Sequence, residues 1–511
     1  MTRAWGEYAT AFWSGAAVLV LELLGTRLVA PLYGATIYVW SALITVTLAA
    51  LAAGYAGGGA WADRPAANLE RALRLRVAAA VGVSAVWILL VPAARSPVLA
   101  LSSRWGVRAG ALAGASALLA VPLACLGAVG PLLAKLRAAE RPGMGRAMGS
   151  VSAVSTVGSV AGALAAGFWL IPRGGIGVLL GGLALSLAAL ALAWLVSAKA
   201  GPRAAAALIA ALAAAGLARP RPRPIPGLRA AETSLYGDVL VVDREDWGKR
   251  VLYIDGIANT VVDLHTLQST SDYIRSFELA RFLRPRAAKA LLVGLGGGAL
   301  PGRLARFGVS TDVVDIDPAV ERAARRWFGF RPTGELHIED GRRFLSRPGP
   351  AYDFIYFDAF NGDQQPFHLF TRESFEETAR RLSPDGVLVI NLIGYAMGPR
   401  AELKRSVTKT LRSVFPNVRL LAANTDLNPA QSYVNMTFLA SRGPLDFQAD
   451  PEKDPEIGRY ASRVRANWIE EGAGDGELLT DDRAPVEALG ADAFVAIRQR
   501  DLGSNLELLT L

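Results

Sequence analysis

The segment Lys289-Ala-Leu-Leu-Val-Gly-Leu-Gly-Gly-Gly298 predicts a buried β-strand that runs directly into a glycine loop. Its apolar run is continuous rather than alternating, which is typical of a strand covered on both faces in a parallel sheet. A helix is expected over 299–307, and the next strand is Asp312-Val-Val-Asp315-Ile-Asp317. This order of strand, loop, helix and strand is typical of a Rossmann-like α/β domain.

The same alternation continues toward the C-terminus. Further elements are predicted as a helix over 318–328 and strands at 336–340, 352–358 and 386–391. Upstream, alternating apolar residues predict a β-hairpin with strands at 238–242 and 250–254. We therefore expect a small β-strand subdomain over 230–285, which forms a β-hairpin layer, followed by a doubly wound Rossmann-like domain over 286–511.

Glycines and acidic side chains follow the predicted strands at their carboxyl ends, where ligands bind in such sheets. Asp315 and Asp317 end the second strand, where an acid usually binds ribose hydroxyls. Asp340 follows the third strand and is placed to accept a hydrogen bond from an adenine amino group. Asp358 follows the fourth strand and is placed near the reacting atoms. Each acid alone is more often a helix cap or a turn residue, but all of them together favour a nucleoside site. Its predicted residues are Gly294, Gly296, Gly298, Asp315, Asp317, Asp340, Gly341 and Asp358.

The rim of this predicted site indicates which nucleoside it takes. The loop departs from the G-x-G-x-x-G pattern of dinucleotide sites, and no basic phosphate clamp accompanies it. An acid-rich rim suits a cationic sulfonium nucleoside better than an anionic dinucleotide. We therefore expect S-adenosylmethionine or its decarboxylated form as the co-substrate. With one cysteine and three histidines in the chain, no metal site is predicted.

The two halves of the chain differ in composition. Of the 511 residues, 52% are hydrophobic and 19% are charged, which excludes a disordered chain and a small disulfide scaffold. Residues 1–229 carry a net charge of +15, whereas 230–511 carry −6. The basic residues of the first half lie mainly in short loops between apolar runs, which favours membrane topology over nucleic-acid binding.

The first half predicts a multi-span α-helical membrane domain over 1–218. A helix needs about 20 apolar residues to cross the hydrocarbon core. Candidate spans are 8–31, 37–61, 76–101, 108–134, 148–171 and 174–197, with a marginal seventh segment at 204–218. Glycines and serines recur in the second and fifth spans, which lets helices approach closely in lipid. A basic, proline-rich linker follows over 219–229.

Loop charges predict the orientation of these helices. Arginines and lysines concentrate in the loops after spans two, four and six. The positive-inside rule then places the N-terminus and the exit of span six in the cytoplasm. We expect a multi-pass protein of the cell inner membrane with a cytoplasmic catalytic domain. If 204–218 also spans the membrane, that domain is periplasmic instead.

The order of motifs over 230–395 resembles that of spermidine synthases, the aminopropyltransferases. The motifs that carry the resemblance are Glu232-Thr-Ser-Leu-Tyr236, Ile254-Asp255-Gly256-Ile-Ala-Asn259, Gly294–Gly298, Val314-Asp315-Ile-Asp317, Asp340-Gly341 and Asp358-Ala-Phe-Asn361. Two further motifs resemble a bacterial subgroup in which a membrane domain precedes the synthase-like domain. They are Pro366-Phe-His368-Leu-Phe-Thr371 and Leu479-Thr480-Asp481-Asp482-Arg-Ala-Pro485.

The resemblance implies transfer of an aminopropyl group from decarboxylated S-adenosylmethionine to an amine such as putrescine, which releases methylthioadenosine. Asp358 would be the catalytic base, because an amine with a pKa near 10 must lose a proton before it attacks. Asp255 and Asn259 would join the donor site. The residues implied at the amine site are Tyr236, Tyr273, Asn361 and Asp363. For Tyr273, ordinary packing is the more frequent explanation.

Departures from the family pattern fall mainly on amine anchors. An acid of the glycine loop is replaced by Gly297, the signature glutamine by Asn259, and the second acid of Asp-x-x-Asp by Asn361. The family's Tyr-Gln/His-Glu element is Tyr273-Ile-Arg275 here. Asp363 is a candidate to compensate. The pattern therefore predicts a nucleoside site more firmly than it predicts spermidine as the product.

Two other functions stay open at this stage. One is a different S-adenosylmethionine chemistry, such as methyl transfer, cyclisation or lysis, because the amine anchors are changed. The other is a polyamine transporter or sensor, since Glu22 lies within a predicted span; a structural role for Glu22 is equally frequent. The expected partners are an amine substrate and the lipid bilayer, without nucleic acid, and a homodimer is left open.

Overall fold

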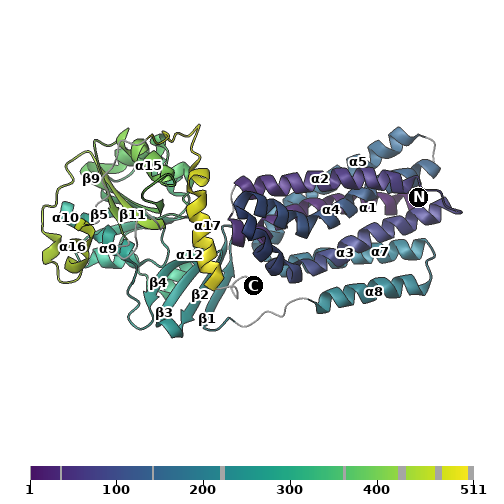
Figure 1. Ribbon diagram of the computed structural model, residues 1–511, viewed down its shortest axis with the longest axis horizontal. Coiled ribbons are helices and arrows are strands. Elements are labelled where there is room, and N and C mark those ends of the chain that lie inside the picture. The colour runs from purple at the N-terminus through teal and green to yellow at the C-terminus, as the bar shows by residue number, and fades with distance from the viewer. Residues whose placement is uncertain are drawn as a thin grey trace. The chain divides into compact units, whose positions relative to one another are not determined.

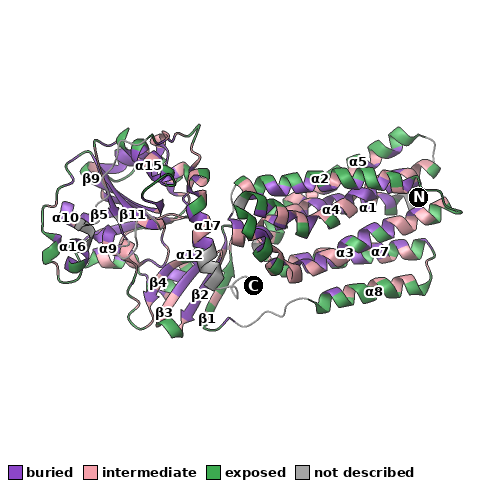
Figure 2. Cartoon of the chain, viewed as in Figure 1, coloured by how far each residue is buried: buried purple, intermediate pink, exposed green. Residues whose placement is uncertain are grey.

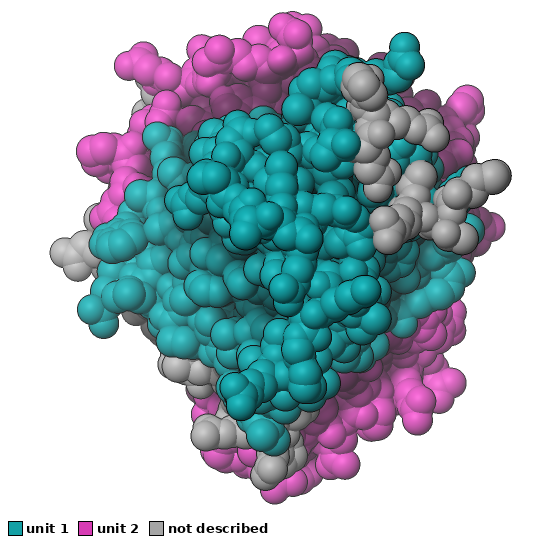
Figure 3. Space-filling view, turned by 90° about the vertical axis from the view of Figure 1, so that its right-hand side faces the viewer, with its two compact units in different colours: residues 1–223, 507–511 teal, residues 224–506 magenta. Residues whose placement is uncertain are grey.

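The computed structural model describes residues 2–34, 37–140, 143–218, 225–360, 364–423, 433–466 and 475–504. The chain divides into two compact units, residues 1–223 with 507–511 and residues 224–506, which Figure 3 shows in different colours. The first unit is built of helices only, and the second carries every described strand.

The first unit is a bundle of long apolar helices (Figure 1). Six helical stretches in the described part of the chain are long and apolar enough to cross a membrane, and they match the six predicted spans. The main helices are α1 (Thr2–Tyr33), α2 (Ile37–Ala62), α3 (Leu69–Ser102), α4 (Gly106–Glu140), α5 (Met144–Ala165) and α7 (Ile176–Ser197). A single π-helical turn, Ala166–Leu170, and the short α6 (Ile171–Arg173) follow α5.

Glycines allow the closest helix contacts in this unit. A Cβ atom on Gly54 of α2 would lie 2.2 Å from the carbonyl oxygen of Ala124 on α4. On α5, a Cβ atom on Gly158 would lie 2.0 Å from the carbonyl oxygen of Phe12 on α1. Only glycine permits such approach, and so these positions set the spacing of two helix pairs. A Cβ atom on Gly57, by contrast, would meet no atom within 4 Å.

The marginal apolar segment forms α8 (Pro202–Leu217). Its 16 residues make a helix of about 24 Å, which is shorter than the roughly 30 Å hydrocarbon core. It lies alongside α3, where Leu208 packs against Gly82, and most of its residues are exposed (Figure 2). The helix is therefore a peripheral member of the bundle.

The second unit begins with a four-stranded antiparallel sheet where the sequence predicted a hairpin. Its strands, in chain and spatial order, are β1 (Leu228–Thr233), β2 (Asp238–Arg244), β3 (Lys249–Ile254) and β4 (Ile257–Asp263). Asp255 and Gly256 connect β3 to β4, and both have positive φ angles, of 49° and 78°. Such a two-residue turn matches the twist of the strands it joins.

The main sheet of this unit has seven strands in the described residues, in the order β10-β11-β9-β8-β5-β6-β7. Pairing is parallel from β9 to β7 and antiparallel for β10 and β11. The strands are β5 (Lys289–Val293), β6 (Ser310–Asp315), β7 (Leu336–Ile338), β8 (Tyr352–Phe357), β9 (Leu382–Tyr395), β10 (Asn417–Ala422) and β11 (Tyr433–Ser441). This is a doubly wound Rossmann-like sheet, as the sequence predicted.

Helices cover both faces of the main sheet (Figure 1). They are α9 (Asp272–Glu278), α10 (Ala280–Leu283), α11 (Ala299–Ala305), α12 (Pro318–Trp327), α13 (Gly341–Ser346), α14 (Arg372–Arg381), α15 (Glu402–Arg412), α16 (Gly458–Ala466) and α17 (Val486–Ser504). Alternate residues of each central strand enter opposite cores, so that Leu292 faces one core and Leu291 the other. Burial on both faces explains why these strands are apolar throughout.

Candidate functional site

A cleft opens at the carboxyl ends of the parallel strands, where β5 lies between β6 and β8. The chain moves outward from β5 in both directions at this point, and ligands of doubly wound sheets bind at such a switch point. The cleft is lined by Tyr236, Ile254, Asn259, Val293, Gly294, Leu295, Gly296, Val314, Asp315, Ile316, Asp317, Val320, Asp340, Gly341, Asp358, Ala359, Phe360, Pro366, His368 and Leu369.

The glycine loop after β5 forms the floor of this cleft. Gly294 has a φ of 93°, and a Cβ atom there would lie 2.4 Å from the carbonyl oxygen of Asp358. The backbone amide of Gly294 donates to the carbonyl oxygen of Val314 (2.8 Å), and that of Gly298 donates to Leu295 (2.9 Å). Because these amides are used inside the protein, the loop is not a phosphate cradle. It suits a ligand without phosphate groups.

Asp315 ends β6 and lies beside the glycine loop. Its carboxylate accepts from the backbone amides of Leu295 (2.7 Å) and Asp317 (2.8 Å). Burial raises the pKa of Asp315 to about 6, against the lowering effect of these two hydrogen bonds. The remaining acceptor capacity of this carboxylate faces the cleft, which is suited to a pair of hydroxyl groups.

Asp317 has a structural role in addition to its place in the cleft wall. One carboxylate oxygen caps α12 by accepting from the amide of Ala319 (2.8 Å). The other accepts from the hydroxyl of Ser234 (2.6 Å), whose own oxygen accepts from the amide of Tyr236 (2.9 Å). Asp317 therefore ties the turn that carries Tyr236 to the main sheet. The sequence alone gave no sign of this role for Ser234.

Asp340 follows β7 and also combines two roles. One of its oxygens caps α13 by accepting from the amide of Arg343 (2.9 Å). The other lies 3.0 Å from Nε2 of His368. The hydrogen bond from His368 is the largest of the effects that lower the pKa of Asp340, and partial burial opposes it. The carboxylate therefore stays ionised at neutral pH, as an acceptor for an amino group requires.

Asp358 ends β8 and is the most perturbed acid of the cleft. Burial raises its pKa to about 7, although hydrogen bonds from Asn391 and Tyr273 lower it. The Asn391 amide donates to one Asp358 oxygen over 2.9 Å. Burial and the neighbouring Asp358 charge together raise the pKa of Tyr273, and so its phenol stays protonated and donates to Asp358. An acid with a pKa near the working pH is suited to accept a proton during a reaction.

Two buried side-chain acceptor atoms, one of them on the Asn391 that contacts Asp358, have no hydrogen-bond partner among the described residues. They are the side-chain carbonyl oxygens of Asn391 and Gln365. The Gln365 amide donates to the backbone of Ile393 (3.4 Å), two residues beyond Asn391 on β9. A buried unpaired acceptor costs about 1–3 kcal/mol. No motif in the sequence pointed to either residue, although Asn391 is the polar residue that ends the predicted strand 386–391, just as Asp358 ends the predicted strand 352–358.

The structure brings most of the predicted site residues to the cleft wall. Gly298, Asp255 and Tyr273 lie outside that wall. Gly298 has a φ of 73° and packs on Phe330, and Asp255 accepts from the amide of Asp238 (2.9 Å) at the β3–β4 turn. Asn361 and Asp363 lie outside the described residues. Tyr273 lies beside Asp358 and forms a hydrogen bond with it.

Thr260 explains why the glycine loop has no acid at position 297. The amide of Gly297 donates to the Thr260 hydroxyl (2.9 Å). A Cβ atom on Gly297 would lie 2.6 Å from the Thr260 methyl carbon and 3.1 Å from the Phe328 ring. Any side chain at 297 would therefore displace β4 or Phe328. The packing of β4 against the loop therefore favours glycine at position 297 over an acidic residue.

The chain is similar in sequence to several known proteins. Residues 273–441 match the model of the spermine/spermidine synthase domain. A polyamine aminopropyltransferase of Vibrio vulnificus is 31% identical over 279 residues, which cover 50% of this chain and 90% of that protein. An N-terminal histidine N-methyltransferase of Emericella nidulans is 35% identical over 198 residues, which cover 36% of this chain and 34% of that protein.

Among solved structures, a probable spermidine synthase from Corynebacterium glutamicum has a TM-score of 0.42 and 20% identity. The match covers 51% of this chain and 97% of that one. The family model and the aminopropyltransferase relative define the class of this Rossmann-like protein, which is a transferase. The chain belongs to the polyamine aminopropyltransferase (spermidine synthase) family and is an enzyme of the aminopropyltransferase type. Family membership favours catalysis over a non-catalytic sensor.

Contact between Gly297 and Thr260 leads to a first prediction. We expect Gly297→Ala to lower the free energy of unfolding by about 1–3 kcal/mol, the usual cost of overpacking. Adding Thr260→Ser should restore part of it, because the serine lacks the methyl group that the new side chain meets. Urea denaturation of the full-length single and double variants measures this coupling. Gly302→Ala is the matched control, since its Cβ atom meets nothing within 4 Å; equal losses at both glycines would contradict the steric explanation.

Proposed function

We propose that the protein is a membrane-integrated polyamine aminopropyltransferase. It transfers an aminopropyl group from decarboxylated S-adenosylmethionine to an amine such as putrescine and releases methylthioadenosine. The observation that carries this proposal is the environment of Asp358, a half-buried acid with a pKa of about 7 at the carboxyl edge of the sheet. Family membership supports the same reaction class.

Asp358 is the group that receives the proton in this reaction. The amine nitrogen attacks the methylene carbon bonded to the sulfonium, and the carbon–sulfur bond breaks with its electron pair moving to sulfur. Before this attack Asp358 accepts a proton from the ammonium form of the amine, because a protonated nitrogen has no lone pair with which to form the new bond. The sulfonium is already a good leaving group, so orientation of donor and amine supplies most of the remaining acceleration.

The donor is held by the acids and backbone of the cleft. Asp315 binds the ribose hydroxyls, Asp340 accepts from the adenine amino group, and Gly294 and Gly296 let the nucleoside lie against the backbone. Asn259 and Tyr236 line the same cleft and contact the aminopropyl arm. No metal is assigned to this reaction, since the sulfonium carries the electrophilic charge itself.

The acceptor amine is held beside Asp358. The unpaired carbonyl oxygens of Asn391 and Gln365 accept N–H bonds from the amine, which removes the cost of leaving them unpaired. The Tyr273 phenol orients Asp358 by donating to it. Asn361 and Asp363 remain predicted contacts of the same amine. The two amide oxygens are neutral, so that recognition of the amine's positive charge rests on Asp358 and on the predicted contact with Asp363.

Methyl transfer is the second candidate, because a histidine N-methyltransferase matches part of the chain at 35% identity. In that reaction intact S-adenosylmethionine would donate its methyl group and leave S-adenosylhomocysteine. The two reactions need the same nucleoside contacts and differ in the space for the donor's carboxylate. Product identity therefore separates them directly.

The helical unit integrates the enzyme into the cell inner membrane, with the catalytic unit on the cytoplasmic side. The apolar length of six helices and the basic loops between them support this placement. The length of α8, about 24 Å, is short for a seventh crossing. An even number of crossings returns the chain to the side of its N-terminus. The catalytic unit then binds its charged sulfonium nucleoside on the side of the membrane where the N-terminus lies.

The first test is turnover. Purified enzyme should form methylthioadenosine from decarboxylated S-adenosylmethionine and at least one amine of a putrescine, cadaverine and spermidine panel. Asp358→Asn should lower kcat by about 10²–10⁴-fold, the contribution of a general base. Asp353→Asn is the matched control, because Asp353 lies at the opposite end of the same strand and accepts backbone amides there. S-adenosylhomocysteine as the product would replace this function with methyl transfer, and full activity in Asp358→Asn would remove the assigned base.

The raised pKa of Asp358 predicts a pH dependence. Because only the ionised carboxylate accepts a proton, kcat/KM should fall as the pH drops below about 7. Asn391→Leu removes a hydrogen bond that lowers the pKa of Asp358, so the acidic limb should move upward by about one pH unit. Asn417→Leu, an asparagine of the remote strand β10 whose amide donates to Gly443, is the control. A limb that does not move in Asn391→Leu would contradict the assignment.

Reporter fusions test the membrane topology. A fluorescent protein that matures only in the cytoplasm, fused at the C-terminus, should fluoresce, and alkaline phosphatase at the same position should be inactive. Fusions at residue 143, between α4 and α5, and at residue 104, between α3 and α4, mark the two sides. Active phosphatase at the C-terminus would show that α8 crosses and would place the catalytic unit outside.

A further inference from the structure

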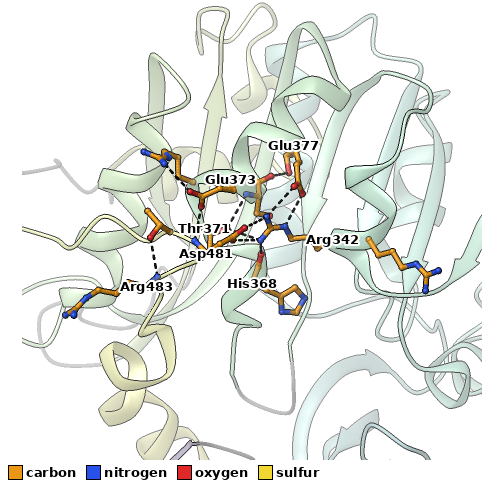
Figure 4. Close-up of polar contacts among 12 residues, drawn as sticks. Arg342, His368, Thr371, Glu373, Glu377, Asp481 and Arg483 are labelled. Atoms are coloured by element: carbon orange, nitrogen blue, oxygen red, sulfur yellow. Dashed lines mark hydrogen bonds and ion pairs between the residues drawn. The ribbon is translucent and has the colours of Figure 1, made fainter.

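A cluster of charged residues behind the cleft is centred on Arg342 of α13. Its guanidinium donates to both carboxylate oxygens of Asp481, over 2.5 and 2.7 Å, and to Glu377 of α14 over 3.0 Å. Figure 4 shows these side chains converging on Arg342 from separate parts of the chain. Asp481 lies 139 residues along the chain from Arg342. In the sequence Asp481 stands out only as part of the motif Leu479–Pro485, which does not indicate Arg342 as its partner.

The same guanidinium holds the segment that carries His368. It donates to the backbone carbonyl of His368 (2.9 Å) and to the Thr371 hydroxyl (3.1 Å). The Thr371 hydroxyl donates in turn to Asp481 (2.7 Å) and accepts from the amide of Ser374, which caps α14. The position of His368 is therefore fixed from behind by a charged clamp of Arg342 and Asp481.

This clamp sets the geometry of Asp340 inside the cleft. Nε2 of His368 lies 3.0 Å from one Asp340 oxygen, and the other oxygen is held by the amide of Arg343. Both Asp340 and His368 line the cleft. With one donor on each oxygen, the carboxylate cannot rotate freely, and it presents only acceptor lone pairs to a ligand. Neither fixed donor comes from the ligand.

We propose that His368, held by Arg342 and Asp481, is a positioning residue that makes Asp340 select a 6-aminopurine over a 6-oxopurine nucleoside. The inference rests on the proposed function, in which the cleft takes a nucleoside donor. An amino group at position 6 donates to the fixed carboxylate. An oxo group there would place two acceptors against each other, which a rigid site rejects strongly. Without His368 the carboxylate turns away or takes up a proton, and the distinction between the bases weakens.

The experiment measures binding of methylthioadenosine and methylthioinosine to the full-length enzyme by titration calorimetry. The wild type should prefer methylthioadenosine by at least about 100-fold. His368→Leu should reduce that ratio about tenfold or more, and His368→Gln should restore most of it, because glutamine keeps an N–H donor. Asp481→Asn, which loosens the clamp, should reduce the ratio to a smaller extent. Glu376→Gln is the matched control, since Glu376 forms only an exposed ion pair on α14.

The outcomes separate this inference from the proposed function. A wild type that binds neither nucleoside would remove the proposed function itself. A wild-type preference that persists unchanged in His368→Leu and Asp481→Asn would overturn only the role of His368. Equal weakening of both nucleosides in these variants would also overturn it, because a purely structural role lowers both affinities together. His368 is partly exposed, so its substitution leaves the core intact.

Discussion

Parallel pairing of β5 with both β6 and β8 is the constraint on which the site depends. It places the ends of neighbouring strands at one edge of the sheet, so that Asp315, Asp340 and Asp358 meet although they are far apart in sequence. The close approach of Gly294 to the backbone of Asp358 keeps this edge compact. Three acids in one cleft would repel one another if all were exposed and mobile, and the protein controls each of them differently.

The control of each acid comes from its hydrogen bonds and burial. The hydrogen bond from His368 lowers the pKa of Asp340 and keeps it ionised, whereas burial raises the pKa values of Asp315 and Asp358 toward neutral pH. Acids with separate environments can have separate roles in one site. An ionised Asp340 suits base recognition, and an Asp358 that titrates near pH 7 suits proton transfer. The interpretation of a strand-end acid as a helix cap and its interpretation as a ligand are not exclusive, because Asp317 and Asp340 cap helices from the cleft wall.

The helices of the first unit could be predicted from composition alone, without reference to the chemistry of particular side chains. Apolar length and loop charge were enough to predict its six main helices. The glycine pattern predicted close helix packing without showing where it occurs. Gly54 and Gly158 lie at tight helix contacts, whereas a Cβ atom on Gly57 or Gly59 would meet no atom within 4 Å. A pattern of small residues shows that close packing is allowed, but the partner helix determines which glycines need it.

Local patterns along the chain were sufficient for the Rossmann-like fold, the family and the positions of the strand-end acids. Continuous apolar strands, the glycine loop and the acids after them are local features, and each can be recognised within a few residues. The partners of those acids came only from the tertiary structure. Asn391 reaches Asp358 from β9, Ser234 reaches Asp317 from the small sheet, and Asp481 reaches Arg342 across 139 residues. Hydrogen bonds of this kind join segments with no common periodicity, so neither composition nor spacing predicts them; only the packing of the sheet brings the atoms within 3 Å of each other.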